Sequence, residues 1–353
     1  MTASPFADPT PAPAAGRVRM SNGRYKLPDP DTGQDTLFTR VSTIAKMLED
    51  TYHLDQWKDR MLAKGLAMRP DLVMLAGATP LEDKRTFTDL TRSSRDTAGG
   101  SEGANHGTAF HSLTELVDRG QPTPQGTHPD NVKRLELYKQ RLEEWQLQVI
   151  PGWMERVVLN REHRIVGRTD RALFAQNMSL LLNETYRLVG PEAPPPPIVP
   201  PTASIIGDVK SQKSMDFGCM AIAMQLAIYA HADLVWNEET GQWDEPDVEL
   251  NQDVAVVMHV PSDRIAADIH VIDIARGWEL VQMAMDIRAA RKEKLNRKLE
   301  HSSGRDWKND IMNASTKQDL SAIWKAADAA GEWTDELLKL GKARLSEIEK
   351  EVA

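Results

Sequence analysis

The chain has 353 residues, of which 27% are charged and 41% hydrophobic, a composition typical of a globular protein. Its single cysteine, Cys219, excludes a disulfide framework and a four-cysteine iron–sulfur cluster. The net charge of -9 argues against a surface coated in basic residues, so any contact with nucleic acid needs a local cluster of Lys and Arg. No apolar run reaches the ~20 residues of a membrane span, and no secretory leader is apparent. We therefore expect a cytoplasmic protein without a membrane partner.

Residues 1–17 are rich in Pro, Ala, Ser and Thr, and we expect a disordered tail. Residues 18–102 predict a β-hairpin followed by helices. The hairpin strands are expected at 24–27 and 37–41, around a turn-rich stretch, and the helices at residues 42–48, 54–67, 70–75 and 80–95. The basic residues of these helices form either a surface that faces DNA or an ordinary solvated face. The Gly/Ser-rich stretch up to Ala104 is expected to be mobile.

A helix is predicted over residues 107–119, with Gly120 as its C-cap. His111 and Glu115 are four residues apart and therefore neighbours on one face of it. Another helix is expected over 129–147, followed by two strands at 153–159 and 164–174. The second of these strands carries Asp170.

The short apolar run that begins at Ile205 predicts a buried strand. Residues two apart on a strand point to the same side, so Asp208 and Lys210 project together while Val209 points into the core. The helix expected next, over 217–236, is apolar almost all round, with Gln225 and Tyr229 as polar interruptions one turn apart. A surface ion pair and a satisfied buried Gln/Tyr pair are the structural alternatives to a functional site.

The remaining segments flank this central stretch. Residues 180–182 and 186–189 predict strands or a hairpin, and the proline-rich stretch 190–201 predicts an exposed loop. Two further strands are expected at 254–260 and 268–272, then a helix over 276–299 with a basic end. A separate αα-hairpin is expected over 305–353, with a Ser315/Gln318 capping box and Thr334 capping the last helix.

Four motifs in this order resemble the PD-(D/E)XK nuclease superfamily, in particular its phage-type, RecB-like exonuclease branch. They are Gly107-x-x-x-His111, Asp170, Asp208-Val209-Lys210 and Gln225-x-x-x-Tyr229. The resemblance covers roughly residues 103–276. It implies an α/β (α+β) core at 103–300, with a central mixed β-sheet flanked by helices as in restriction endonucleases. The long insertion between Asp170 and Asp208 departs from the family's pattern.

The resemblance also implies the roles of these residues. His111, Asp170, Asp208 and the Val209 carbonyl would bind Mg²⁺ or Mn²⁺, and Lys210 would position the attacking water. Gln225 and Tyr229 would support the site and the DNA backbone. Six further residues are weaker candidates: Glu115 as an orienting partner of His111, Glu155 as an additional acidic residue, and as DNA-binding residues Arg168, Lys213, Arg291 and Lys292. A nitrogen ligand suits manganese, so we expect manganese to support activity at least as well as magnesium.

The expected function is hydrolysis of DNA phosphodiester bonds in recombination or repair, most simply as an exonuclease. DNA is the expected partner, with a recombination or single-strand annealing protein as a second one, in a host cytoplasm if the chain is phage-encoded. An endonuclease of the same superfamily and a non-catalytic DNA-binding or adaptor protein are the alternatives. No phosphate-binding loop is present, so neither an ATP-driven helicase nor a nucleotide cofactor is expected. No paired CxxC or HExxH motif is present, so a zinc enzyme is not expected either. Strand polarity and oligomeric state stay open.

Overall fold

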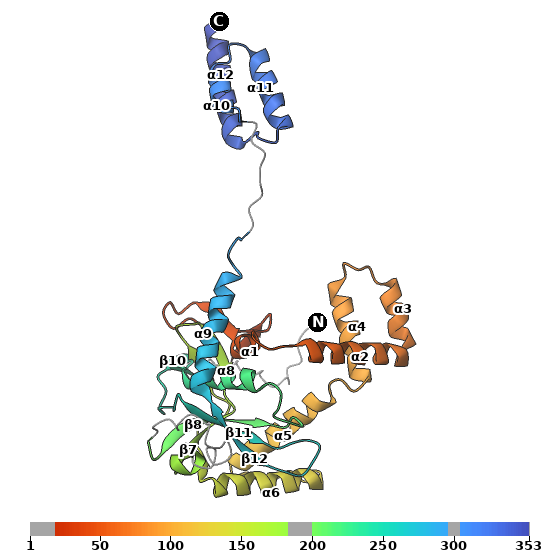
Figure 1. Cartoon of the computed structure of the whole chain (residues 1–353), viewed down its shortest axis with the longest axis vertical. Helices are drawn as coiled ribbons and strands as arrows, with labels where there is room; N and C mark the ends of the chain where they lie inside the picture. The colour runs from red at the N-terminus through yellow and green to blue at the C-terminus, as the bar shows by residue number, and fades with distance from the viewer. Residues whose placement is uncertain (1–17, 183–199, 296–303, 353) are drawn as a thin grey trace, which may run out of the picture. The chain divides into compact units, whose positions relative to one another are not determined.

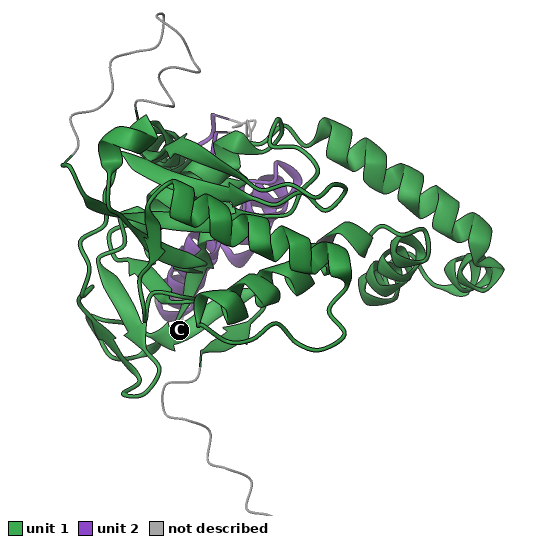
Figure 2. Ribbon diagram, turned by 90° about the horizontal axis from the view of Figure 1, so that it is seen from below, with its two compact units in different colours: residues 1–291 green, residues 292–353 purple. Residues whose placement is uncertain are grey.

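The computed structural model describes residues 18–182, 200–295 and 304–352. It divides into two compact units, residues 1–291 and 292–353 (Figure 2). The expected N-terminal tail, the strand at 186–189 and most of the proline-rich loop lie outside the described residues. Within the described ranges, no helix combines the length and apolar character needed to cross a membrane.

Unit 1 contains a five-stranded sheet with the strand order β12-β11-β8-β7-β4 among the described residues. Strands β8 and β11 are parallel, and the other neighbours are antiparallel. The central strand β8 is buried over most of its length, as its apolar run predicted. The strands are β4 (Leu147–Val149), β7 (Arg171–Ala175), β8 (Ala203–Lys210), β11 (Val254–His259) and β12 (Asp268–Asp273).

A second, seven-stranded sheet has the order β1-β2-β3-β6-β5-β9-β10 in the described part of the chain. The N-terminal hairpin belongs to it because β3 pairs in parallel with β6. The hairpin is confirmed, although Val41 begins a helix instead of ending the strand. The strands are β1 (Arg19–Ser21), β2 (Arg24–Pro28), β3 (Asp35–Arg40), β5 (Val157–Asn160), β6 (Ile165–Arg168), β9 (Leu234–Asn237) and β10 (Gln242–Asp244).

The prediction of one strand over 164–174 is wrong. Strand β6 ends at Arg168 in the seven-stranded sheet, and β7 begins at Arg171 in the five-stranded sheet. Asp170 therefore lies in the short link between the two sheets. Arg171 is opposite Gly207 in the antiparallel β7–β8 pair, so Asp170 lies beside Asp208, one position further along.

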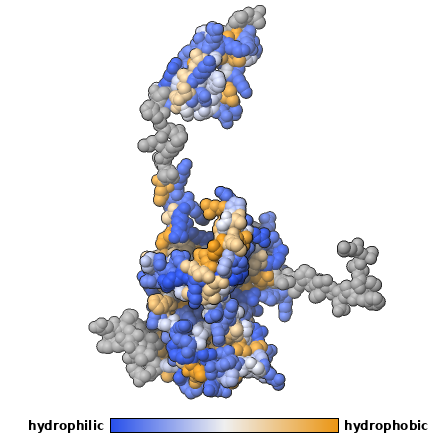
Figure 3. Space-filling model, turned by 90° about the vertical axis from the view of Figure 1, so that its right-hand side faces the viewer, coloured by the Kyte–Doolittle hydropathy of each residue, from blue (hydrophilic) through white to orange (hydrophobic). Residues whose placement is uncertain are grey.

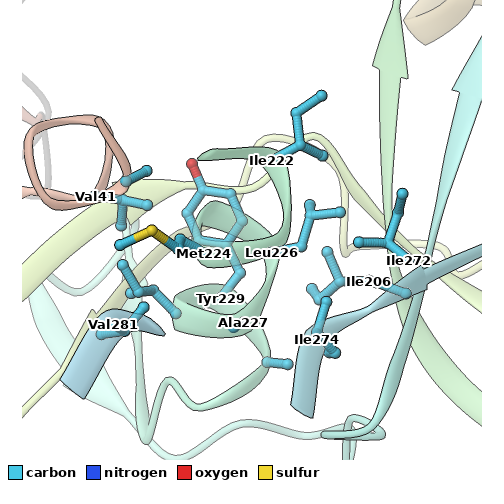
Figure 4. Close-up of a cluster of buried hydrophobic side chains, with 14 of the residues drawn as sticks. Val41, Ile206, Ile222, Met224, Leu226, Ala227, Tyr229, Ile272, Ile274 and Val281 are labelled. Carbon is cyan, nitrogen blue, oxygen red and sulfur yellow. The ribbon is translucent and has the colours of Figure 1, made fainter. Parts of the chain in front are cut away.

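The core next to β8 is built by three helices, α1 (Val41–Ala45), α8 (Cys219–Ala230) and α9 (Ile274–Ala290). Figure 4 shows Tyr229 among the aliphatic side chains of this core, with Val41 and Val281 on one side and Ile206 and Ile272 on the other. Helix α8 ends at Ala230 and not at Trp236, because residues 234–237 form β9 and pair with β5 and β10. Helix α9 likewise ends at Ala290.

Helices α2 to α6 also belong to the described part of unit 1. Helices α2, α3 and α4 project from it (Figure 1), and we refer to them as the helical arm, residues 52–97. Helix α5 begins at Glu102, earlier than the predicted Gly107, so it includes the end of the stretch that was expected to be mobile. The helices are α2 (Tyr52–Met68), α3 (Pro70–Ala78), α4 (Lys84–Thr97), α5 (Glu102–Asp118) and α6 (Pro129–Glu144).

Three local predictions in this region need correction. Helix α6 ends before Leu147, because that residue pairs with Ala175 in β4 and β7. The strand expected from Trp153 begins only at Val157, while Trp153 is buried in a turn. Residues 178–182 are helical instead of extended, and their buried side chains join the core.

Unit 2 contains α10 (Trp307–Met312), α11 (Lys317–Ala329) and α12 (Asp335–Val352). The expected αα-hairpin is therefore a three-helix unit, with Ile311 as the centre of its own apolar core. The capping box is formed by Thr316 and Asp319, one residue beyond the predicted pair. Thr334 caps the last helix as expected, accepting a hydrogen bond from the Leu337 amide at 3.3 Å.

Candidate metal centre

A cavity of about 400 Å³ lies where the two sheets meet helices α5 and α8. Most of the residues singled out in the sequence line it, although they come from four separate segments of the chain. These are His111 and Glu115 on α5, Glu155 in the loop before β5, Arg168 and Asp170 at the β6–β7 link, and Gln225 and Tyr229 on α8.

His111 is the centre of this arrangement. Its Nε2 atom lies 3.5 Å from Asp170 Oδ2, 3.6 Å from Glu155 Oε1 and 3.9 Å from Glu115 Oε1. The Nε2 atom is buried and makes no hydrogen bond. Ligand atoms of His111, Glu115 and Glu155 all lie within 4.8 Å of one another. A buried polar atom normally has a partner. The imidazole nitrogen and the three carboxylates together form a ligand set that suits a divalent cation with both nitrogen and oxygen ligands.

Burial and the positive charge of Arg171 lower the pKa of His111 below its ordinary value. The imidazole is therefore neutral near neutral pH, which is the form that binds metals. The sequence reasoning missed Arg171. It is fully buried, pairs with Asp118 and donates to Tyr138 Oη at 2.6 Å and Thr114 Oγ1 at 3.1 Å. Its only sequence signal is its place directly after Asp170.

Asp208 lies on β8 with both carboxylate oxygens buried and without hydrogen bonds. Lys210 Nζ is 2.6 Å from Asp208 Oδ2, so the two side chains do project together, but this ion pair lacks hydrogen-bond geometry. Burial, and then the charge of Asp170, raise the pKa of Asp208 to about 7. Burial alone would lower the pKa of Lys210, but Asp208 and Asp170 raise it, so Lys210 stays charged. A cation placed beside Asp208 would compensate its buried charge.

Asp170 is held in place by the backbone of the neighbouring strand. Its Oδ2 atom accepts a hydrogen bond from the Val209 amide at 3.0 Å. The same oxygen is the one that faces His111. The Val209 side chain points into the core as predicted. The role of its carbonyl as a metal ligand stays a prediction.

Glu155 and Glu115 both lie in the cluster itself. Glu155 has a φ of +56°, a left-handed conformation that is uncommon outside glycine and is often found at functional sites. Its amide donates to the Asp170 carbonyl at 2.9 Å, which ties the loop to the β6–β7 link. Burial, and then the charge of Glu115, raise the pKa of Glu155, while Arg168 at 3.7 Å opposes that shift.

Gln225 and Tyr229 are brought together as their spacing predicted. Gln225 Nε2 donates to Tyr229 Oη at 3.4 Å. Burial, and then Asp170 and Asp208, raise the pKa of Tyr229 well above its ordinary value, so the phenol keeps its proton. Gly167 makes room for this ring, because a Cβ there would lie 2.6 Å from Tyr229 Cε1.

The predicted DNA-binding residues are not brought together. Arg168 lines the cavity, but Glu155 and Glu238 lie within ion-pair distance of it. Lys213, Arg291 and Lys292 are exposed and are not among the residues that line the cavity. The sequence reasoning also missed five lining residues from the hairpin, α1 and α5. These are Tyr25, Arg40, Ser42, Thr108 and Ser112, and they reach the cavity through the β3–β6 pairing and the first turns of α5.

Comparison with known proteins gives little further information. No family model matches the chain, and no curated protein matches it. A solved structure described as "Crystal structure of SSO0001" is similar over 44% of this chain and 58% of its own length. The sequence identity is 13% and the TM-score is 0.20. Such a likeness does not establish a shared fold, so the side chains of the cavity carry the functional assignment.

Proposed function

We propose that this protein is a metal-dependent deoxyribonuclease that acts as an exonuclease on DNA ends, in recombination or repair. The observation that carries the proposal is the buried, unpartnered Nε2 of His111 among the carboxylates of Asp170, Glu155 and Glu115. The Asp208–Lys210 pair stands beside Asp170 on the next strand. The resemblance of the sequence motifs to RecB-like exonucleases supports the same reading.

The topology of the five-stranded sheet also supports the proposal. Strands β4, β7 and β8 are consecutive antiparallel neighbours, and β11 joins β8 in parallel after the crossover helix α8. We propose that these elements form the restriction-endonuclease-like core that the motifs imply. The candidate residues then lie at the end of β8 and at the start of β7.

The donor set fits Mg²⁺ or Mn²⁺, because it offers several carboxylates and one neutral imidazole. His111, Asp170, Asp208 and Glu155 would hold the ion, with Glu115 as an additional carboxylate. A bound divalent ion would supply Lewis-acid polarisation of the phosphate and a more acidic water. The buried oxygens of Asp208, which accept no hydrogen bond, are consistent with this role.

The other side chains act on water and substrate directly. Lys210, kept charged by Asp208 and Asp170, orients the attacking water and offsets the negative charge that develops on the phosphate. Tyr229 keeps its proton and, with Gln225, presents hydrogen-bonding groups at the cavity wall. We propose that Arg168, which lines the cavity, contacts the DNA backbone.

The deciding experiment incubates the purified protein with linear and with closed circular duplex DNA, each in magnesium, manganese or EDTA. We expect metal-dependent loss of linear DNA alone, with manganese at least as effective as magnesium. Lys210→Ala removes the charge that orients water, so we expect a loss in rate of about 10²- to 10³-fold. Asp208→Ala is expected to be inactive.

Other outcomes would each contradict a particular part of the proposal. Cleavage of circular DNA would identify an endonuclease instead of an exonuclease. Full activity in EDTA would contradict the metal site, and full activity in Lys210→Ala would contradict the role of Lys210. Markedly weaker activity in manganese would count against His111 as a ligand. DNA binding without cleavage under any condition would favour the non-catalytic binding protein.

A further inference from the structure

Two helices of the helical arm cross with their backbones in direct contact. Ser94 Oγ on α4 donates to the Leu62 carbonyl on α2 at 2.8 Å. A Cβ added to Gly65 would lie 1.8 Å from the Ser94 carbonyl oxygen, so only glycine permits this approach. Between the same two helices lies a groove of about 600 Å³. We call it the α2–α4 groove.

The α2–α4 groove combines two aromatic rings with three cationic side chains. Trp57 and Phe87 supply the rings, and Trp57 is 37% exposed although it is large and apolar. Lys58, Arg92 and Arg95 supply the cations, against one carboxylate in the lining, that of Asp96. The lining is therefore net positive in a chain whose formal charge is -9.

These cations are available to a ligand. Lys58 pairs only with Asp55 and Arg92 only with Asp89 among the ion pairs described, each three residues away on its own helix. Such exposed pairs contribute about 0–1 kcal/mol and are readily exchanged for a phosphate. The Nε atom of Arg95 is buried and makes no hydrogen bond.

The arm also exposes more apolar surface than a solvated face requires. Hydrophobic surface gathers on the side of unit 1 from which the arm projects (Figure 3). The exposed large hydrophobic residues of α2 and α3, besides Trp57, are Tyr52, Leu54, Met68, Val73, Met74 and Leu75. Single exposed apolar residues are ordinary, whereas several of them on helices that also carry exposed cations favour a binding surface.

The groove leads toward the candidate metal centre. Gly100 lines it, and α5 begins two residues later at Glu102. His111 lies nine residues further along the same helix, a distance of about 14 Å at 1.5 Å per residue. A DNA strand whose phosphate is at His111 would therefore reach the groove within a few nucleotides.

We propose that the α2–α4 groove binds single-stranded DNA, with bases stacked on Trp57 and Phe87 and phosphates held by Arg92, Arg95 and Lys58. Aromatic faces accept bases only where these are unpaired, and aromatic rings interleaved with cations are the chemistry of single-strand binding sites. The link from this groove to cleavage rests on the proposed nuclease function. The binding itself does not, which allows the two to be tested separately.

The test is equilibrium binding of a short fluorescent oligothymidylate to the full chain in EDTA, where no metal-dependent cleavage occurs. Stacking on one aromatic side chain is worth about 1–3 kcal/mol, so Trp57→Ala is expected to weaken affinity by about 5- to 150-fold. Trp57→Phe keeps a stacking face and is expected to lose much less. Arg95→Gln is expected to lower the slope of log affinity against log salt by about 0.7, the value for one single-strand phosphate contact.

Matched controls lie in the helical arm outside the groove. Leu81→Ala before α4 and Arg85→Gln on α4 remove an exposed apolar and an exposed basic side chain, and both are expected to bind as the wild type does. Circular dichroism checks that each variant is folded. Unchanged affinity in folded Trp57→Ala and Arg95→Gln would overturn the proposal.

Two further outcomes separate this proposal from others. If Trp57→Ala changes the elution volume of the protein but not its DNA affinity, the groove is a protein interface and the proposal fails. If the wild type degrades linear DNA while Trp57→Ala binds single strands normally, the nuclease stands and the groove assignment falls. If no DNA is cut but the groove variants lose single-strand binding, the groove assignment stands and the nuclease proposal falls.

Discussion

Asp208 carries an unfavourable buried charge. Its carboxylate is 1% exposed, faces the negative charge of Asp170 and accepts no hydrogen bond. Lys210 offsets part of this cost, yet the pKa of Asp208 still rises to about 7. A group whose pKa is higher in the folded than in the unfolded state lowers stability once the pH exceeds its unfolded value. Stability therefore does not explain this residue, whereas the proposed metal site would.

Asp208→Asn should consequently stabilise the metal-free protein in a pH-dependent way. The cost of the charged form is absent below about pH 4, grows between pH 4 and 7, and is complete above about pH 7. We expect the variant to raise the free energy of unfolding by about 1–4 kcal/mol near pH 8 and to change it little near pH 4. Denaturant unfolding in EDTA at both pH values measures this.

The same variant tests the metal independently of cleavage. Manganese should raise the unfolding temperature of the wild type near pH 8, since a ligand that binds only the folded state stabilises it. Asp208→Asn should lose most of that shift. The exposed Asp263→Asn serves as the control and should behave as the wild type does. A destabilised Asp208→Asn near pH 8 would contradict the assigned burial of charge.

At the scale of elements, helix α5 connects the two candidate sites. Its first turn follows the α2–α4 groove, and its third turn carries His111. The side chains of His111 and Glu115 face the cavity while Phe110 packs into the core. One amphipathic helix thus fixes the position of the candidate metal ligand His111 relative to the helical arm.

The geometry of the arm depends on Gly65. Gly65→Ala places a Cβ against the backbone of Ser94, which cannot yield as a side chain could. We expect a destabilisation of about 1–3 kcal/mol, partly offset by the better helix propensity of alanine. Because the arm projects from the core, the effect should appear as faster limited proteolysis within residues 52–97.

Gly77→Ala in α3 is the matched control. A Cβ there meets nothing within 4 Å, so the variant should be neutral or slightly stabilising. Similar proteolysis of the two variants would show that the α2–α4 crossing does not hold the arm together. Loss of single-strand affinity in Gly65→Ala but not in Gly77→Ala would support the groove assignment.

At the scale of the whole molecule, the chain folds as two units with separate cores. Ile311, at the centre of the three-helix unit, is completely buried. Ile311→Ala should cost about 2–5 kcal/mol, because it removes buried methyl groups and leaves a cavity. We expect this loss in the unfolding of unit 2 alone, with the metal-induced shift of unit 1 unchanged.

The neighbouring Met312→Ala provides the comparison, since Met312 is 52% exposed and its truncation should change stability by less than about 0.5 kcal/mol. Calorimetry of the full chain resolves the two transitions. If the full chain shows a single unfolding transition, and Ile311→Ala shifts that whole transition to lower temperature, the two units unfold cooperatively.

Local spacing in the sequence was enough to predict much of the site. A strand period of two residues places Asp208 and Lys210 together, and a helix period near four places His111 beside Glu115 and Gln225 beside Tyr229. These relations are confirmed because each depends only on the backbone of one element. The same holds for the buried strand β8 and for the helical C-terminal region.

The other features of the site depend on pairing between distant segments, and only the tertiary structure decided them. Asp170 lies in a link between two sheets, and a single hydrophobic run cannot show that its halves pair with different partners. The N-terminal hairpin reaches the cavity through β3 and β6, and helix α8 stops early because β9 pairs with β5. Glu155 joins the cluster through a left-handed backbone that no periodicity reveals. Periodicity constrains neighbours in the chain, whereas non-local hydrogen bonding and burial select among the arrangements it permits.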